Sequence, residues 1–322
     1  MQLGVFTVLF QQLPLEQALD VISAAGVQAV EIGTGGYPGA AHCQPDILLG
    51  DADKLSTFQQ AIASRGLTLS ALSCHANPLH PRAATAQAAH TTFEHTVRLA
   101  ERIGVTRVVL FSGCPGDSDQ ARYPNWVTAA WPPDYQELLA WQWSEKVIPY
   151  WRAAAAFARE HGVRLCFEMH PGFVVYNPET LLRLRAECGD NIGANLDPSH
   201  LFWQGIDVIE AIRVLGKADA IYHVHAKDTA IDPHNAAVNG VLDTKPLSQA
   251  ADRSWIFRTV GFGHDELFWR TFVSALRKVG YDHVLSIEHE DALASINEGF
   301  LKAVRFLQGV MLTEQPAEAW WV

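Results

Sequence analysis

Short apolar runs alternate with longer segments of helical periodicity along the whole chain. The run LGVFTVLF (3–10) opens the pattern, and the segment after it has apolar residues at every third or fourth position until Gly26. The next apolar run, VQAVEIG (27–33), follows directly. Because parallel strands must be joined by long crossover connections, which are usually helices, this alternation predicts a parallel sheet covered by helices.

The alternation repeats eight times. We expect strands at 3–10, 27–33, 67–76, 105–113, 163–170, 191–197, 220–228 and 283–291. Glycines follow several of the intervening helical segments, as at helix ends that need a left-handed residue. These segments cover about 15–25, 51–65, 84–103, 134–161, 178–187, 207–214, 265–279 and 293–310. Eight repeats favour a closed (β/α)8 TIM barrel. An open doubly wound sheet is the alternative, but no G-x-G-x-x-G motif follows the first strand.

The composition is that of a chain with a large buried core. Apolar residues make up 48% and charged residues 18% of the 322 residues, which argues against general disorder. TIM barrels commonly reach this length as one domain, so we expect residues 1–310 to form a single barrel domain. Residues 311–322 would form a C-terminal tail, whose AWWV end suggests docking onto this chain or onto a neighbouring one.

Charge and hydropathy limit the partners that the chain can bind. The formal net charge of −11 argues against nucleic acid, which binds through a basic face. The first ten residues lack the pattern of a signal peptide, and no run reaches 18 apolar residues, so we expect a cytoplasmic protein without a membrane span. A small-molecule partner is compatible with this surface, and a homo-oligomer stays open.

Two predicted loops are long for a barrel. Residues 112–133 follow the fourth strand, and residues 229–263 follow the seventh. Both loops lie on the side of the barrel where the strands end, which is where TIM barrels build their active sites. Loops of this length usually serve as lids or binding elements.

Four predicted strands end in a residue that can bind a metal ion. These residues are Glu168 in CFEMHPG, Asp197 in NLDPSH, His225 in YHVHAKD and Glu288 in SIEHED. Neighbouring barrel strands end at one mouth, so the four side chains should converge, and three converging carboxylates need a cation to compensate their charge. Oxygen ligands with one imidazole favour Mn²⁺, Mg²⁺ or Co²⁺ over a thiolate-type zinc site. Alternatively, each carboxylate alone could cap a helix or order a loop.

Five segments of the chain resemble one family of enzymes. FEMHPG, LDPSHL, HVHAKD, RTVGFGH and SIEHED are similar, in this order, to segments of the sugar phosphate isomerase/epimerase family of xylose isomerase-like TIM barrels. The resemblance covers roughly residues 1–310. It implies that the four strand-end residues hold a divalent metal, with Mn²⁺ preferred and Mg²⁺, Co²⁺ and Zn²⁺ left open. It also implies that the second histidine of HVH is the ligand, so that His223 faces away or lies behind it.

The resemblance also implies two substrate contacts. His200 matches a family histidine that contacts a substrate oxygen, and Arg258 in RTVGFGH matches an arginine that binds substrate hydroxyls. About thirty residues separate HAKD from Arg258, which is far more than in ketose 3-epimerases. A salt bridge that orders the loop is the alternative role for Arg258. The GFGH segment (261–264) is read as a turn, with a phosphate site at a helix N-terminus as the alternative.

Further side chains should surround the site. His170 and Lys227 each lie two residues beyond a candidate ligand, on the same strand face, and could act as acid, base or oxyanion partner. Lys227 could instead pair with Asp228. Other candidates for the pocket wall are the strand-end residues Phe6, Glu31 and His75, and Trp203 after His200. Core packing is the alternative for the two aromatic residues.

The resemblance implies a metal-dependent isomerase or epimerase of a keto sugar or a related polyol ketone. Proton abstraction beside the carbonyl would give a metal-stabilised enediolate, with Glu168 and Glu288, as the resemblance implies, exchanging the proton. A metal-dependent lyase or hydratase of a 3-keto-glycoside or inosose is the main alternative. An endonuclease IV-like nuclease does not fit the acidic charge. A sugar-binding barrel without activity stays open.

Overall fold

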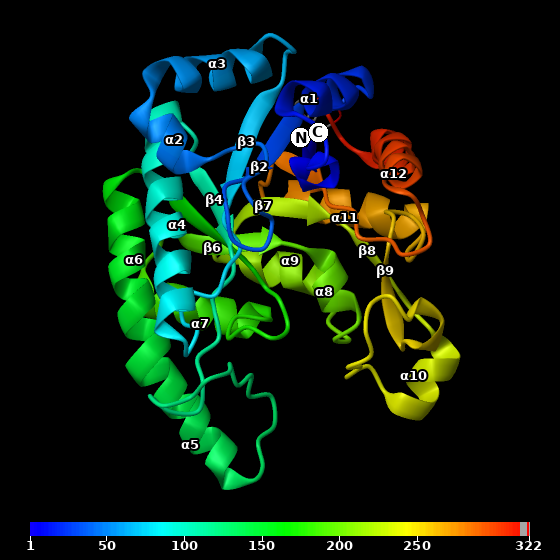
Figure 1. Cartoon of the computed structure of the whole chain (residues 1–322). Helices are drawn as coiled ribbons and strands as arrows, with labels where there is room; N and C mark the ends of the chain where they lie inside the picture. Colours follow the sequence, from blue (N-terminus) through cyan, green and yellow to red (C-terminus); the bar gives the residue numbers. More distant parts are fainter. Residues whose placement is uncertain (316–320, 322) are drawn as a thin grey trace.

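The barrel predicted from the sequence is confirmed. The computed structural model describes residues 1–315 and 321, and eight parallel strands form a closed barrel in the order β1-β10-β7-β6-β5-β4-β3-β2 (Figure 1). The pairing of β1 with β10 closes the sheet, so the barrel has no free edge. The strands are β1 (Gln2–Phe6), β2 (Ala29–Gly33), β3 (Thr68–Ser73), β4 (Arg107–Leu110), β5 (Arg164–Glu168), β6 (Ile192–Leu196), β7 (Ile221–Ala226) and β10 (Val284–Ile287).

Helices surround the barrel, and most of them bury apolar side chains against it, whereas Pro133–Trp141 and Pro233–Asn239 contain no buried residue. The long ones are α1 (Leu15–Ala24), α3 (Ala52–Ala63), α4 (Ala83–Ile103), α5 (Pro133–Trp141), α6 (Ile148–Glu160), α7 (Pro178–Cys188), α9 (Val208–Lys217), α11 (Glu266–Lys278) and α12 (Ile296–Val310). Short helices are α2 (Pro45–Gly50), α8 (Pro198–Phe202) and α10 (Pro233–Asn239). Two tryptophans, Trp151 on α6 and Trp269 on α11, are fully buried in the layer between helices and strands. Among the described residues, none of the helices has the length and apolar character needed to cross a bilayer.

Two predicted elements differ from the structure in an informative way. The first apolar run is a strand only to Phe6, and Thr7–Phe10 form a 3₁₀ helix. A short apolar run indicates that its residues are buried, but it does not distinguish a strand from a helix. Phe10 is buried in this way, packed edge-on against Phe300 of α12. The helix expected at 134–161 is interrupted by a π-helical turn over Gln142–Val147. Pro149 follows this turn and cannot donate the next helical hydrogen bond.

The long loop after β7 is an ordered insertion rather than an irregular lid. It contains β8 (Asp228–Ile231) and β9 (Trp255–Arg258), which pair antiparallel, with α10 between them (yellow in Figure 1). Trp203 of the barrel stacks on Trp255 of β9, with ring centroids 4.6 Å apart and planes 6° from parallel. This stack fixes the insertion beside the mouth of the barrel. The docking expected for the C-terminal tail falls on residues 316–320 and 322, which lie outside the described part.

Candidate metal centre and substrate cavity

The four strand-end residues meet at one point. Each of them offers a ligand atom, and all these atoms lie within 4.8 Å of one another. His225 Nδ1 lies 3.2 Å from Glu168 Oε2 and 3.1 Å from Glu288 Oε2. Asp197 completes the group from the N-cap of α8, where its Oδ1 accepts a hydrogen bond from the amide of Ser199. The barrel therefore brings the candidate ligands together as its topology predicts.

The donor set fits a divalent cation. Asp197 Oδ2 and His225 Nδ1 are buried and have no hydrogen-bond partner, which is unfavourable for polar atoms unless something else binds them. Burial raises the pKa of Asp197, although the nearby Lys227 and His200 partly oppose this effect. When His225 is neutral, as a metal ligand must be, the three carboxylates and the single ammonium of Lys227 leave two negative charges. A divalent ion with a preference for oxygen and imidazole would balance them.

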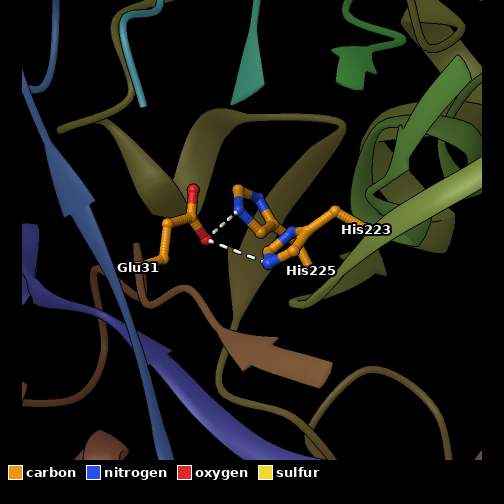
Figure 2. Close-up of side chains that lie close together, drawn as sticks. All are labelled: Glu31, His223 and His225. Atoms are coloured by element: carbon orange, nitrogen blue, oxygen red, sulfur yellow. Dashed lines mark hydrogen bonds and ion pairs between the residues drawn. The ribbon is translucent and has the colours of Figure 1, made fainter. Parts of the chain in front are cut away.

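Glu31 orients the candidate ligand His225. His225 Nε2 donates a 2.9 Å hydrogen bond to Glu31 Oε2, which also accepts from Ser286 Oγ at 2.8 Å (Figure 2). Burial would raise the pKa of Glu31, but the charge of His225 and the hydrogen bonds from His225 and Ser73 outweigh it and lower the pKa to about 2. The ionised carboxylate thus assigns the ring proton to Nε2. Without a metal, burial would lower the pKa of His225, but the charges of Glu31 and Glu288 raise it well above its usual value, so Nδ1 carries a proton that a metal ion would have to displace.

His223 lies inside the barrel behind His225. Its Nδ1 donates to Asn195 Oδ1 at 2.9 Å, and its Nε2 stays 3.9 Å from Glu31 Oε2. Burial, together with the nearby histidines, lowers the pKa of His223 to about 3, so the ring is neutral. Glu31, His223 and His225 form a second group with ligand spacing. Glu31 already accepts hydrogen bonds there, and none of these three residues lines the cavity described below.

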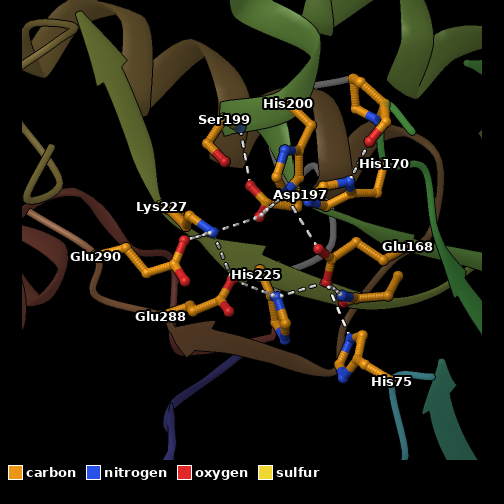
Figure 3. A network of polar contacts seen from close by, with 12 residues as sticks. His75, Glu168, His170, Asp197, Ser199, His200, His225, Lys227, Glu288 and Glu290 are labelled. Atoms are coloured by element: carbon orange, nitrogen blue, oxygen red, sulfur yellow. Dashed lines mark hydrogen bonds and ion pairs between the residues drawn. The ribbon is translucent and has the colours of Figure 1, made fainter. Parts of the chain in front are cut away.

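Glu168 is held by hydrogen bonds from three sides. His200 Nε2 donates to its Oε1 at 3.1 Å, and His75 Nε2 and Asn195 Nδ2 donate to its Oε2 at 3.2 and 3.0 Å (Figure 3). Burial would raise the pKa of Glu168, but the neighbouring imidazoles of His200, His225 and His75 hold it well below the usual value. His75 and His200, which were expected to contact substrate, therefore also fix a candidate metal ligand.

A cavity of about 350 Å³ opens above these ligands. Glu168, Glu288 and His170 lie on its polar side together with His75. The predicted Phe6 lines it as well, with its ring 5.9 Å from that of His225. Aromatic and apolar side chains complete the wall, and the sequence analysis did not identify them: Val8, Tyr37, Pro38, Phe111 and Phe173. The volume is in the range of pockets that enclose small organic ligands.

His170 enters the cavity as a neutral imidazole. Its ring lies 4.0 Å from that of His200 and packs edge-on against Phe111. Burial, with repulsion from His200, lowers the pKa of His170 to about 3. Its Nδ1 donates to the carbonyl of Pro171 at 2.6 Å, which leaves Nε2 as a proton acceptor.

Lys227 faces the carboxylates and not its neighbour Asp228. Its ammonium lies 3.1 Å from Glu288 Oε2, 2.7 Å from Glu290 Oε2 and 3.6 Å from Asp197 Oδ2. Burial would lower the pKa of Lys227, but these charges outweigh it and raise the pKa well above the usual value. The alternative ion pair between Lys227 and Asp228 is therefore not among the contacts of these two described residues. Glu290 is a partner of Lys227 that was not expected from the sequence.

Asp228 organises the GFGH turn. Its Oδ2 accepts hydrogen bonds from the amides of Gly261, Gly263 and His264 at 2.9–3.1 Å. These amides are the groups that would bind a phosphate, and the carboxylate already occupies them. The reading of GFGH as a turn is the one that the structure supports.

Two residues expected at the substrate hold the insertion instead. Arg258 Nε binds Asp291 Oδ2 at 3.1 Å, which is the loop-ordering salt bridge. Trp203 is buried against Trp255 and Phe257. Neither residue lines the cavity above the candidate ligands. The register of β8 with β9 places Arg258 opposite Asp228, and this pairing could not be read from the sequence.

Glu31 is the residue whose role the sequence analysis missed. It was considered for the pocket wall, yet it is fully buried inside the barrel and contacts His225 across it. One sequence signal was present, because a lone carboxylate in the apolar strand VQAVEIG must have a partner. That partner is 194 positions away along the chain.

The chain has relatives with this fold. It matches the family described as xylose isomerase-like TIM barrel over residues 19–310. It is 39% identical over 311 residues to the uncharacterized protein YfiH of Bacillus subtilis (strain 168), which covers 96% of this chain and 98% of YfiH.

Solved structures share the architecture at low sequence identity. The probable 3-DHS dehydratase AsbF of Bacillus anthracis, involved in petrobactin synthesis, has a TM-score of 0.66 at 14% identity and covers 96% of this chain and 99% of its own. The IolI protein with a bound zinc atom has a TM-score of 0.64 at 19% identity, covering 96% and 98%. A D-psicose 3-epimerase solved in the presence of D-fructose has a TM-score of 0.60 at 16% identity, covering 97% and 99%. The family match and the YfiH relative show that this chain belongs to the xylose isomerase-like TIM barrel family.

Proposed function

We propose that this protein is a divalent-metal-dependent isomerase or epimerase of a keto sugar or a related polyol ketone, with residues 1–310 as its catalytic domain. One observation carries the proposal. Glu168 and Glu288 both lie against His225 Nδ1, at 3.2 and 3.1 Å, on the floor of a cavity large enough for a sugar. Two carboxylates beside one substrate position suit a reaction that moves a proton.

The metal would be held by Glu168, Asp197, His225 and Glu288, whose ligand atoms lie within 4.8 Å of one another. Mn²⁺ is our first choice, because most of the ligand atoms are carboxylate oxygens, and Mg²⁺, Co²⁺ and Zn²⁺ are the alternatives. Zinc is the ion bound in the IolI structure. A divalent ion there supplies positive charge to the oxyanion that forms when a proton leaves the carbon beside a carbonyl.

The side chains around the cavity would carry the proton. Burial would raise the pKa of Glu288, but the charges of Lys227 and His225 hold it well below the usual value, so this carboxylate is ionised, as a proton acceptor must be, although the low pKa makes it a weak base. Glu168 is ionised as well. One of them would remove the proton from one face of the substrate, and the other would return a proton to the opposite face. Lys227 and His170 would contact substrate oxygens.

A lyase or hydratase acting on a 3-keto-glycoside or inosose is the second candidate. It begins with the same proton abstraction and then expels a substituent from the next carbon. Beside the two carboxylates, the Lys227 ammonium can donate a hydrogen bond to such a departing group, whereas His170 Nε2, which carries no proton, can accept one from a substrate hydroxyl. AsbF, with the same fold, is described as a probable dehydratase.

Deuterium exchange tests both candidates. The protein would be loaded with Mn²⁺ and incubated in D₂O with ketoses, inososes and 3-keto-glycosides, and the products followed by NMR. Deuterium in an epimerised or isomerised product supports the first candidate, whereas release of an aglycone or of water supports the second. Glu288→Gln should abolish exchange, while Glu137→Gln, an exposed change on α5, should leave it intact. Exchange into none of these substrates would contradict both candidates.

A further inference from the structure

A second cavity meets the first one beside the candidate metal centre. It has a volume of about 390 Å³, and Glu290 lines both cavities. The insertion contributes one wall, with Leu247, Ile256 and Phe257. The loop between β10 and α12 contributes Ala292 and Ala294, and α12 contributes its first residue, Ile296. The ordered insertion therefore creates a space that the barrel alone would not enclose.

The walls of this second cavity are mainly apolar, and its acidic members are already engaged. Asp291 accepts hydrogen bonds from Arg258 and from both the amide and the hydroxyl of Thr259. Glu290 is bound to Lys227. Leu247 and Ile296 are 55% and 49% exposed, so their apolar surface is available to a ligand. A ligand here would gain mostly from burial of apolar surface.

Lys227 contacts one lining residue of each cavity. The Lys227 ammonium lies 4.2 Å from the centre of the Phe257 ring, while the same ammonium is 3.1 Å from Glu288 Oε2. Figure 3 shows Glu290 beside Lys227 and Glu288, and Glu290 lines both cavities. A group that packs against Phe257 in the second cavity is therefore separated from the candidate ligand Glu288 by the side chain of Lys227. Such a group and a sugar in the first cavity are close enough to belong to one molecule.

We propose that the second cavity is an aglycone subsite, so that the substrate is a glycoside whose keto-sugar ring lies over the candidate metal ligands and whose aromatic aglycone packs against Phe257. This inference rests on the proposed function, because it assigns the first cavity to the sugar. It narrows the substrate class to molecules with an apolar ring attached to the sugar. Buried His289 Nδ1, which has no hydrogen-bond partner, offers one polar contact in the wall for a substituent on that ring.

Binding of matched probes tests the subsite. Dissociation constants of the Mn²⁺-loaded protein would be measured by calorimetry for methyl and 4-nitrophenyl 3-keto-glucosides, in both anomeric forms. We expect the aryl probe of one anomer to bind at least about tenfold more tightly than its methyl counterpart, as burial of an aromatic ring implies. Ala294→Trp should fill the cavity and remove this preference, with the affinity for the methyl probe unchanged. Leu247→Ser should reduce the preference, whereas Leu267→Ser should not, since Leu267 is 72% exposed and lines neither cavity.

The outcomes separate the subsite from the catalytic proposal. Equal affinity for aryl and methyl probes, absence of binding by either, or a preference that survives Ala294→Trp would overturn the subsite. An aryl preference that Ala294→Trp removes, without deuterium exchange into any probe, would support the subsite and contradict the isomerase or lyase proposal. Deuterium exchange into the methyl probe, without tighter binding of the aryl probe, would support the isomerase or lyase proposal and contradict the subsite.

Discussion

Glu31 Oε2 lies 2.9 Å from His225 Nε2, across the interior of the barrel, although the two residues are 194 positions apart in the sequence. This contact decides which ring nitrogen faces the candidate metal ligands. An imidazole whose far nitrogen donates to a carboxylate keeps one tautomer and one orientation and is a stronger ligand. Glu31 is therefore a positioning residue that acts through His225.

We predict that Glu31→Gln weakens metal binding. The amide has nearly the shape of the carboxylate but no charge, so His225 would lose the partner that fixes its Nε2 proton. Loss of such a partner typically reduces metal affinity by about 10–100-fold. Calorimetric titration with Mn²⁺ would measure the change, and circular dichroism would check that the variant is folded. Glu137→Gln, at an exposed position, is the matched control. An affinity equal to that of the wild type would show that Glu31 does not support the ligand.

Asp197→Asn should separate the stability of the metal-free protein from metal binding. Because the pKa of Asp197 is raised in the folded state, its ionised form at neutral pH destabilises the fold when no cation is bound. The variant without metal should therefore melt about 1–3 °C higher than the wild type. Excess Mn²⁺ should raise the melting temperature of the wild type by mass action and leave that of the variant nearly unchanged. A variant that gains as much stability from Mn²⁺ as the wild type would argue against Asp197 as a ligand.

The sequence could predict those features that follow from barrel topology. Glu168, Asp197, His225 and Glu288 end consecutive strands, and any closed parallel barrel brings such ends together. Contacts within the insertion could not be predicted, because residues 229–263 carry no clear hydrophobic period that would indicate strands β8 and β9. The pairing of β8 with β9 sets the position of Arg258, so its salt bridge with Asp291 could not be predicted from the sequence as the alternative to a substrate contact.

Stability should fall on acidification between about pH 6.5 and 4.5, partly through His283. Burial, together with the charge of Arg107, lowers the pKa of His283 to about 4, from about 6.5 in the unfolded chain. Below pH 6.5 the unfolded state binds a proton that the folded state does not, so stability is lost as the pH falls toward 4. One such group contributes at most about 1.4 kcal/mol per pH unit. Urea unfolding of His283→Gln across this range should show a shallower loss, and exposed His234→Gln should not. Parallel slopes for His283→Gln and the wild type would contradict the assignment.

Trp203→Ala should loosen the insertion more than the barrel. Trp203 stacks on Trp255 with centroids 4.6 Å apart, and this stack belongs to a small apolar cluster separate from the main core. Its loss removes a stacking contact and leaves a void, at a cost of about 3–5 kcal/mol that falls mainly on the local structure. Hydrogen exchange measured by mass spectrometry should accelerate in β8 and β9 and stay unchanged in β4 and β5. Trp131→Ala is the control, because Trp131 is 78% exposed. Uniform acceleration through the barrel strands would show that the insertion is not a separate unit.

Lys227→Met should make folding depend on the metal. Lys227 is the buried cation that faces Glu288 and Asp197, and its removal leaves their charges without a fixed partner. Breaking a buried ion pair from one side typically destabilises a protein by about 3–5 kcal/mol. Without metal, the variant should therefore unfold at clearly lower urea concentration than the wild type. With saturating Mn²⁺ the difference should shrink, because the ion replaces the lost positive charge. Lys54→Met is the control, since Lys54 pairs with Asp51 at the surface. An equal deficit with and without Mn²⁺ would mean that Lys227 and the metal do not compensate the same carboxylates.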